Sequence, residues 1–293
     1  MLNKCSLCES ANIQDLYKVI GYNVVKCKDC GFVFVKDEIP KKELVELYTE
    51  TYFHNSAWYH LDKNKYFGYD DYIGDKQNIR DKFDKVIKRI QKYTDKGPLL
   101  DIGCGPGLFL ELAKEKGFTP VQGVDISSYA VEYSTKILNL NVQKGDLLDF
   151  HFASATFNLI IMFDVLEHFQ NPNKILAEAY NILKYNGILA IITPDIDTLI
   201  PKLLKDRWEE IKHIPEHVVF FSKQTLTNVL QNTGFKVLET KYIGHKMSFK
   251  LFLYHAFVNL GINVNLDKIP LANFNITINP FYKLLLIAQK QKV

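Results

Sequence analysis

The sequence lacks an excess of charge of either sign, and it lacks a long hydrophobic run. Its 36 Lys and Arg nearly balance its 33 Asp and Glu, which excludes a large polybasic nucleic-acid surface and leaves room only for a local patch. The longest apolar run near the end, residues 251–264, contains His255, Asn259 and Asn263, so it is too short and too polar to span a bilayer. With 47% hydrophobic and 24% charged residues, the chain is neither disordered nor fibrous.

A secretory leader is also missing. The start, Met1 to Ser6, has no basic segment followed by an apolar one. We therefore expect a cytoplasmic protein with no membrane span, while its oligomeric state is left open.

Cysteine is scarce, and four of the five cysteines fall in the first 30 residues. Cys5 with Cys8 and Cys27 with Cys30 form two C-x-x-C pairs separated by 18 residues. Two such pairs supply four thiolates for a tetrahedral site, and the spacing fits a zinc ribbon. A closed four-thiolate site leaves no open position for substrate, so we expect structural zinc that folds the module. A redox dithiol or another metal is the alternative.

Changes in composition divide the chain into three parts. Residues 1–39 form a zinc-ribbon-like β module, residues 40–97 a helical, aromatic-rich connector, and residues 98–293 the main domain with an insertion at about 244–280. Eleven aromatic or imidazole side chains lie between Tyr48 and Tyr72. They either pack the connector onto the domain or form a lid over a ligand.

From Pro98 onward, short apolar runs alternate with helical patterns, which predicts an α/β fold with a parallel sheet. The predicted strands are 99–102, 121–124, 159–163, 188–192, 235–243 and 282–288. The predicted helices are 75–94, 107–116, 128–138, 173–183, 223–233 and 248–260.

The most informative segment is a glycine loop at residues 99–110. An apolar strand runs into a tight turn and then a helix, so the backbone can approach a ligand closely. The third glycine, Gly107, comes one residue too early for the dinucleotide pattern, and no Gly-Lys-Ser/Thr closes a phosphate loop. The pattern D-x-G-x-G-x-G resembles the cofactor loop of class I S-adenosylmethionine-dependent methyltransferases. In that family the acidic residue that opens the loop, here Asp101, helps to hold the amino acid part of the cofactor.

Further segments resemble the same family in order and spacing. Asp125 ends the second strand, where an acidic side chain accepts the ribose hydroxyls, and Asp146 occupies the adenine position. Residues 157–169 match the fourth strand and the loop over the methionine moiety. The resemblance implies a Rossmann-like sheet with helices on both faces, with S-adenosylmethionine as cofactor. The implied cofactor-binding residues are Asp101, Gly103, Cys104, Gly105, Gly107, Asp125, Ile126, Asp146, Leu147, Phe163 and Asp164.

The cysteine pairs together with this domain resemble bacterial methyltransferases associated with sugar and surface-polysaccharide biosynthesis. They are also similar to deoxysugar C-methyltransferases, which continue into a further C-terminal domain that this sequence does not contain. The resemblance implies a small-molecule acceptor, such as a sugar or nucleotide sugar.

Two histidines are candidates for removing a proton from a hydroxyl acceptor. His168 lies in the loop over the methionine moiety, and His217 lies in a Pro-Glu-His segment followed by Phe-Ser that matches the acceptor region of the family. An amine acceptor would need no base. The sequence shows no divalent-metal cluster of the kind that catechol methylation uses.

Two other functions compete with a small-molecule methyltransferase. An RNA methyltransferase could use the zinc module for docking, but the first 39 residues carry five lysines against five acidic residues, a poor electrostatic match for phosphate. A non-catalytic scaffold could retain the cofactor fold for a partner. Transfer of a labelled methyl group separates the scaffold from both enzymes.

Overall fold

The computed structural model describes residues 1–54, 72–249, 253, 257, 262, 275–279 and 281–292. Most of the helical run predicted at 248–260 lies outside these residues. So do six of the aromatic or imidazole residues predicted in the connector: Trp58, Tyr59, His60, Tyr66, Phe67 and Tyr69. Within the described part, none of the helices combines the length and apolar character needed to cross a membrane.

Seven strands form the central sheet in the order β10-β13-β8-β7-β4-β5-β6. Their bounds are β4 (Leu99–Ile102), β5 (Val121–Asp125), β6 (Asn141–Lys144), β7 (Phe157–Phe163), β8 (Leu183–Pro194), β10 (Phe235–Tyr242) and β13 (Lys283–Lys290). The strands from β8 to β6 are parallel, whereas β13 is antiparallel to both β10 and β8. We predicted a parallel sheet, but the sheet is mixed. Strand β13 follows β10 in the chain and pairs with it in the antiparallel direction, which requires no crossover connection.

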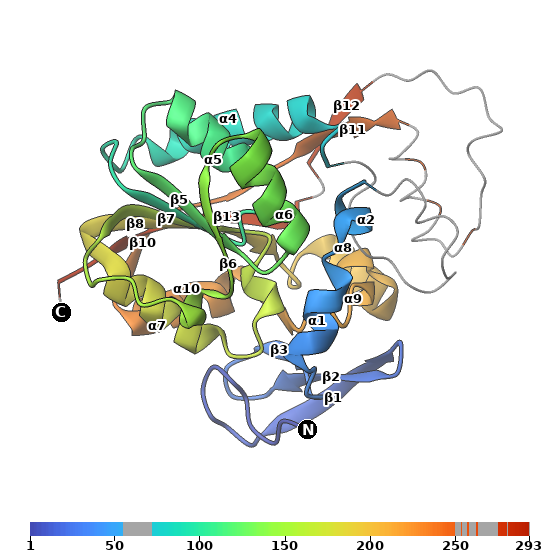
Figure 1. Ribbon diagram of the computed structural model, residues 1–293. Coiled ribbons are helices and arrows are strands. Elements are labelled where there is room, and N and C mark those ends of the chain that lie inside the picture. Colours follow the sequence, from blue (N-terminus) through green and yellow to red (C-terminus); the bar gives the residue numbers. More distant parts are fainter. Residues whose placement is uncertain are drawn as a thin grey trace.

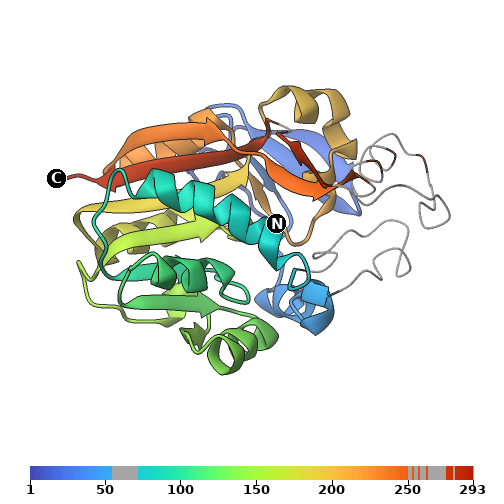
Figure 2. The same ribbon diagram turned by 90° about the horizontal axis from the view of Figure 1, so that it is seen from above.

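Helices cover both faces of this sheet (Figure 1 and Figure 2). On one face lie α4 (Lys76–Ile90) and α5 (Leu108–Glu115), and on the other lie α7 (Pro172–Ile182) and α10 (Lys223–Thr233). Successive strand residues point to opposite faces, so Leu99 packs with α4 and α5 while Leu100 packs with α7 and α10. The sheet order reverses at β4, which places the carboxyl ends of β4, β5 and β7 around one opening.

Two local predictions need correction. The helix predicted at 128–138 is a short α-helix, α6 (Ser128–Glu132), followed by a π-helical turn, η1 (Tyr133–Ile137). Strand β6 was not predicted, because three of its four side chains are exposed and leave no apolar run.

The N-terminal residues form a second, four-stranded sheet. Strands β1 (Ile13–Val19), β2 (Tyr22–Cys27) and β3 (Val33–Val35) pair antiparallel, and β9 (Val219–Phe220) from the main domain adds the fourth strand. The ring of Phe32 lies 5.2 Å from that of Phe221, so both sheets share one hydrophobic core. Helices α1 (Lys41–Leu47) and α2 (Glu50–His54) then lead from this sheet toward the opening (Figure 1).

Two strands of the 244–280 insertion form a separate two-stranded sheet. Strand β11 (His245–Ser248) pairs antiparallel with β12 (Asn275–Ile278) and adds nothing to the large sheet. Ser248 ends β11. The described residues of the helical run predicted near 248–260, namely Phe249, Leu253 and Phe257, are helical.

Candidate functional site

A cavity of about 1120 Å³, counted with the solvent in its mouth, lies at the carboxyl ends of β4, β5 and β7. Ten of the eleven residues predicted to bind the cofactor line it: Asp101, Gly103, Cys104, Gly105, Asp125, Ile126, Asp146, Leu147, Phe163 and Asp164. The parallel strands end side by side here, so short loops bring these residues together from distant parts of the sequence.

The eleventh residue, Gly107, does not line the cavity. It caps α5 with φ +83°, and a Cβ there would lie 2.8 Å from Leu140 Cδ1 and 3.0 Å from Ser134 Cβ. Its role is therefore packing, since only glycine lets the start of α5 approach these side chains.

Gly103 shapes the floor of the cavity. Its φ is +67°, and an added Cβ would lie 2.3 Å from Val165 Cγ2. We expect Gly103→Ala to lower the free energy of unfolding by about 2–4 kcal/mol, from left-handed strain together with overpacking. Gly21→Ala is the matched control, because Gly21 also has a positive φ but has nothing within 4 Å. Urea unfolding that shows equal losses for both variants would contradict the crowding at Gly103.

Two carboxylates stand beside the glycine loop. Asp125 accepts hydrogen bonds from Gly105 N at 2.7 Å and Ser127 N at 2.8 Å, one at each oxygen, so its orientation is fixed. Asp101 is almost fully buried, and burial together with the nearby charge of Asp125 raises its pKa well above its usual value. A cation beside Asp101 would stabilise its ionised form and so lower this pKa.

A third acidic residue closes the far wall. Asp146 caps the short helix η2 (Leu147–Asp149), where its side chain accepts from Leu148 N at 3.3 Å. Leu147 is completely buried behind it. This wall offers one carboxylate next to an apolar surface, which suits a flat heterocycle with an amino group.

The described part of the connector covers the cavity. Tyr48, Tyr52, Phe53 and Tyr72 line it, and Ser127 Oγ donates to Tyr48 O at 2.7 Å. The Phe53 ring lies against the glycine loop, since its Cε1 is 3.8 Å from the Cβ position at Gly105. These four side chains therefore form part of the cavity wall.

Asp164 anchors a buried ionic network that extends to β13 and α4. Its carboxylate is 2.9 Å from Lys283 Nζ and 3.5 Å from Lys82 Nζ, and Lys283 also lies 3.1 Å from Glu210. Burial alone would raise the pKa of Asp164, but the two ammonium groups hold it well below its usual range. Asp164 therefore stays ionised at the edge of the cavity.

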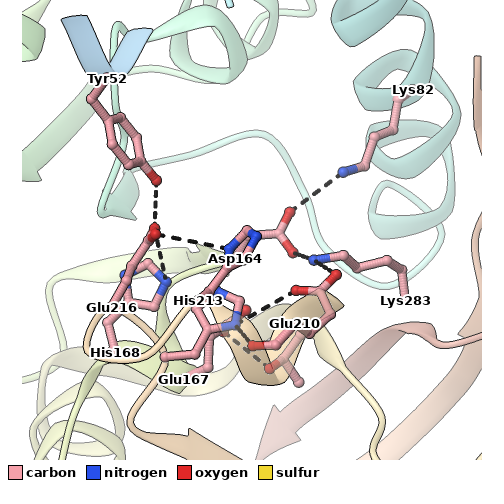
Figure 3. Close-up of polar contacts among 11 residues, drawn as sticks. Tyr52, Lys82, Asp164, Glu167, His168, Glu210, His213, Glu216 and Lys283 are labelled. Atoms are coloured by element: carbon pink, nitrogen blue, oxygen red, sulfur yellow. Dashed lines mark hydrogen bonds and ion pairs between the residues drawn. The ribbon is translucent and has the colours of Figure 1, made fainter. Parts of the chain in front are cut away.

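The two predicted histidines lie close together: the ring centre of His217 is 5.1 Å from that of His168 and 4.9 Å from that of His213. Figure 3 shows His168 and His213 beside Glu216. His168, at the end of η3 (Leu166–His168), lines the cavity, and its Nδ1 is 2.7 Å from Tyr48 Oη. His217 lies behind it and does not line the cavity. Burial lowers the pKa of His168 to about 3 and that of His217 well below its usual value, so both imidazoles are neutral.

The four N-terminal cysteines meet in one cluster. Their Sγ atoms all lie within 4.8 Å of one another, with Cys5 to Cys30 at 3.6 Å and Cys8 to Cys27 at 3.5 Å. A tetrahedral ion with Zn–S bonds of about 2.3 Å requires sulfur separations of about 3.8 Å. The donor set and its spacing therefore fit zinc, and the fifth cysteine, Cys104, lies elsewhere in the cavity wall.

The sequence assigned no role to Lys82, Glu167, Glu210, His213, Glu216 or Lys283. Glu167, Glu210 and Glu216 are almost fully buried, although the sequence around them did not indicate burial. The one available signal was a lysine at the start of the apolar strand 283–288, because a charge that enters a buried strand needs a partner.

A family model described as a methyltransferase domain matches residues 75–240, more than half of the chain. An uncharacterised protein of Methanocaldococcus jannaschii is 29% identical over 151 residues, which cover 51% of this chain and 70% of that protein. The chloroplastic 2-methyl-6-phytyl-1,4-hydroquinone methyltransferase 2 of Oryza sativa is 26% identical over 184 residues. That alignment covers 61% of this chain and 50% of the rice protein.

Among solved structures, a SAM-dependent methyltransferase from Archaeoglobus fulgidus aligns with a TM-score of 0.52 at 20% identity. The alignment covers 73% of this chain and 94% of that one. At this identity the likeness concerns the fold, which is the Rossmann-like arrangement around the cavity.

Proposed function

The chain belongs to the S-adenosylmethionine-dependent methyltransferase family, and from this we propose that it methylates a small molecule, namely a sugar or a related biosynthetic intermediate. The observation that carries the proposal is that one cavity joins the glycine loop and its acidic partners to an aromatic wall. One half of that cavity suits the cofactor, and the other half suits a flat or ring-shaped acceptor.

In the cofactor half, we propose a role for each of the ten predicted residues that line the cavity. Asp101 would hold the ammonium group, Asp125 the ribose hydroxyls, and Asp146 the adenine amino group. Gly103, Cys104 and Gly105 would form the cradle, Ile126 and Leu147 the apolar adenine walls, and Phe163 with Asp164 the methionine end. S-adenosylmethionine would supply an electrophilic methyl group, and the protein aligns the acceptor with it.

Cofactor affinity should depend on the ionisation of Asp101. Because burial and Asp125 raise the pKa of Asp101, the carboxylate gains its proton at a higher pH than an ordinary aspartate does. We expect the Kd for S-adenosylmethionine to rise as the pH falls through this value. Calorimetry across the acidic range tests this. Asp101→Asn should bind more weakly and show a shallower pH dependence, because burial also raises the pKa of Asp125, whose carboxylate remains. An equally steep pH dependence in that variant would contradict it.

In the acceptor half, we propose His168, supported by His217, as the histidine pair through which a hydroxyl acceptor loses its proton. His168 lines the cavity beside Tyr48, and the ring centres of His168 and His217 are 5.1 Å apart. An amine acceptor would need no base.

For the N-terminal module, we propose structural zinc held by Cys5, Cys8, Cys27 and Cys30. The sulfur separations support it, and so does the position of the cluster at one end of a small sheet. Paired thiols of this kind are typical of a reducing compartment, which supports the cytoplasm as the proposed location.

The test is methyl transfer from labelled S-adenosylmethionine into a metabolite extract, followed by mass spectrometry for a gain of one CH2 unit. Asp125→Ala removes a side chain proposed to bind the cofactor, so the label transferred by this variant gives the background level. Label in a sugar or similar metabolite supports the proposal. Label in RNA alone would favour the RNA alternative, and cofactor binding without any transfer would favour the scaffold.

A further inference from the structure

Strand β13 brings a lysine to the edge of the sheet that carries the cavity. Because β13 is antiparallel to β8, its first residue, Lys283, lies beside Pro194, the last residue of β8. This places Lys283 at the carboxyl ends of the parallel strands. The last residue of β13, Lys290, lies at the opposite edge, beside Phe235. The same strand therefore carries one lysine at the functional edge and one lysine far from it.

The ammonium group of Lys283 bridges two carboxylates that come from different segments (Figure 3). Its Nζ is 2.9 Å from Asp164 Oδ1 and 3.1 Å from Glu210 Oε1. Asp164 follows β7 and lines the cavity, whereas Glu210 belongs to α9 (Glu209–Lys212) and does not line it. Burial disfavours the ammonium group, but these two carboxylates raise the pKa of Lys283 well above its usual value. Lys283 is thus a permanent positive charge between the two segments.

The position of Asp164 depends on this contact. Asp164 has φ +53°, in the left-handed region that is unfavourable for a residue with a Cβ atom. Such backbone strain persists only where neighbouring groups hold the residue in place. Its N–H donates to Ile192 O at 2.8 Å, and Lys82 Nζ lies 3.5 Å from its carboxylate. Since Lys283 is closer, at 2.9 Å, it makes the shorter of these two cationic contacts.

Glu210 holds the ring of His217 in turn. His217 Nδ1 is 3.1 Å from the backbone oxygen of Glu210 and 3.5 Å from its Oε2. The ring of His217 lies next to that of His168, which lines the cavity. A carboxylate beside an imidazole favours the protonated ring unless a cation balances its charge. Lys283 supplies that cation at Oε1, the other oxygen of Glu210.

We propose that Lys283 is a positioning residue for methyl transfer, because its ammonium group fixes Asp164 in the cofactor half and, through Glu210, His217 in the acceptor half. This inference rests on the proposed function, which places the methionine end of the cofactor beside Asp164 and the acceptor beside His168. Lys283 does not line the cavity, so it acts through these residues and touches neither ligand. Both halves of the site then depend on one side chain of β13.

The protonation of His217 provides a readout that a purely structural lysine would not change. The titratable groups around it come from three segments, namely the loop after β7, the segment that begins with α9, and β13: Glu167, His168, Glu210, His213 and Lys283. Burial lowers the pKa of His217 well below its usual value, and the nearby His213, His168 and Lys283 lower it further. Lys283→Met removes the ammonium group and leaves Glu210 without its cation. His217 should therefore gain its proton at a higher pH than in the wild type.

Two measurements test the proposal. NMR of protein labelled with ¹⁵N-histidine follows the titration of His217, and His217→Gln assigns its resonance. Calorimetry measures the cofactor half, where Lys283→Met should raise the Kd for S-adenosylmethionine about tenfold, within the usual range for residues that share one ionic network. Lys283→Arg should return both values toward those of the wild type, because a guanidinium group can contact two carboxylates at once.

Lys290→Met is the matched control. Lys290 Nζ donates to the backbone oxygens of Tyr180 at 2.6 Å and Leu183 at 2.8 Å, and these are not carboxylates. The control should leave the Kd and the titration of His217 unchanged. The proposal is overturned if Lys283→Met binds S-adenosylmethionine as tightly as the wild type, if His217 titrates identically in the two proteins, or if Lys290→Met has equal effects.

A double variant keeps the test decisive where Lys283→Met folds poorly. Lys283→Met combined with Glu210→Gln removes the carboxylate that would otherwise lack its cation. Its Kd for S-adenosylmethionine should stay raised, because Asp164 has still lost Lys283, while His217 should titrate close to its wild-type pH. A wild-type Kd in the double variant would overturn the proposal. Neither measurement uses an acceptor, so an absence of methyl transfer to small molecules would contradict the proposed function and leave both readouts valid.

Discussion

Asp125→Ala is expected to weaken S-adenosylmethionine binding by about a hundredfold. Gly105 N and Ser127 N already fix both carboxylate oxygens, so the charge faces the cavity without further reorganisation. Charge-assisted hydrogen bonds contribute about 1.5–3 kcal/mol each, and losing two to the ribose costs about 3 kcal/mol. Isothermal titration calorimetry with the cofactor measures the loss directly.

Two control variants distinguish the loss of the Asp125 carboxylate charge from a change in the shape of the glycine loop. Asp125→Asn keeps the size of the side chain and loses the charge, so an intermediate Kd is expected. The exposed Asp95 is the matched control, and Asp95→Ala should bind as the wild type does. Unchanged affinity in Asp125→Ala, with circular dichroism showing a native fold, would contradict the assignment.

Cys27→Ser is expected to release one zinc and to lower the free energy of unfolding by roughly 4 kcal/mol, or about 10 °C in Tm. Cys27 is fully buried, with its sulfur 3.5 Å from that of Cys8, so serine leaves a three-thiolate site in the sheet. Zinc content by elemental analysis and thermal unfolding by circular dichroism measure the two effects.

The fifth cysteine serves as the control for this experiment. Cys104 is also buried, but it lies beside the glycine loop, away from the cluster. Cys104→Ser should therefore retain its zinc. Equal zinc content in Cys27→Ser and Cys104→Ser would rule out the thiolate site.

The meeting of the glycine loop and its acidic residues in one cavity was predictable, because the sequence signals for them are local. Each glycine and aspartate in it stands at a strand end, within a few residues of the apolar run that identifies the strand. Parallel strands bring such ends together by rule, so Asp101 and Asp125 needed no knowledge of distant contacts.

The buried network was not predictable, because its partners meet only in three dimensions. Lys283 pairs with Asp164 across 119 positions of sequence, and Tyr52 reaches Glu216 across 164. Strand β9 is two residues long, too short for any periodicity to show that it completes the N-terminal sheet. His213 was not predicted either, because it belongs to no sequence motif.

Two backbone hydrogen bonds link the N-terminal four-stranded sheet to the cavity wall. Val35 N, in β3, donates to Val218 O at 2.8 Å, and Val218 N donates to Glu167 O at 2.9 Å, next to His168. Val218 is thus a shared element whose position both regions fix. By thermodynamic reciprocity, if zinc in the thiolate site strengthens ligand binding in the cavity by some factor, that ligand strengthens zinc binding by the same factor. If such coupling exists, the affinity for that ligand differs between protein with and without zinc at the four cysteines.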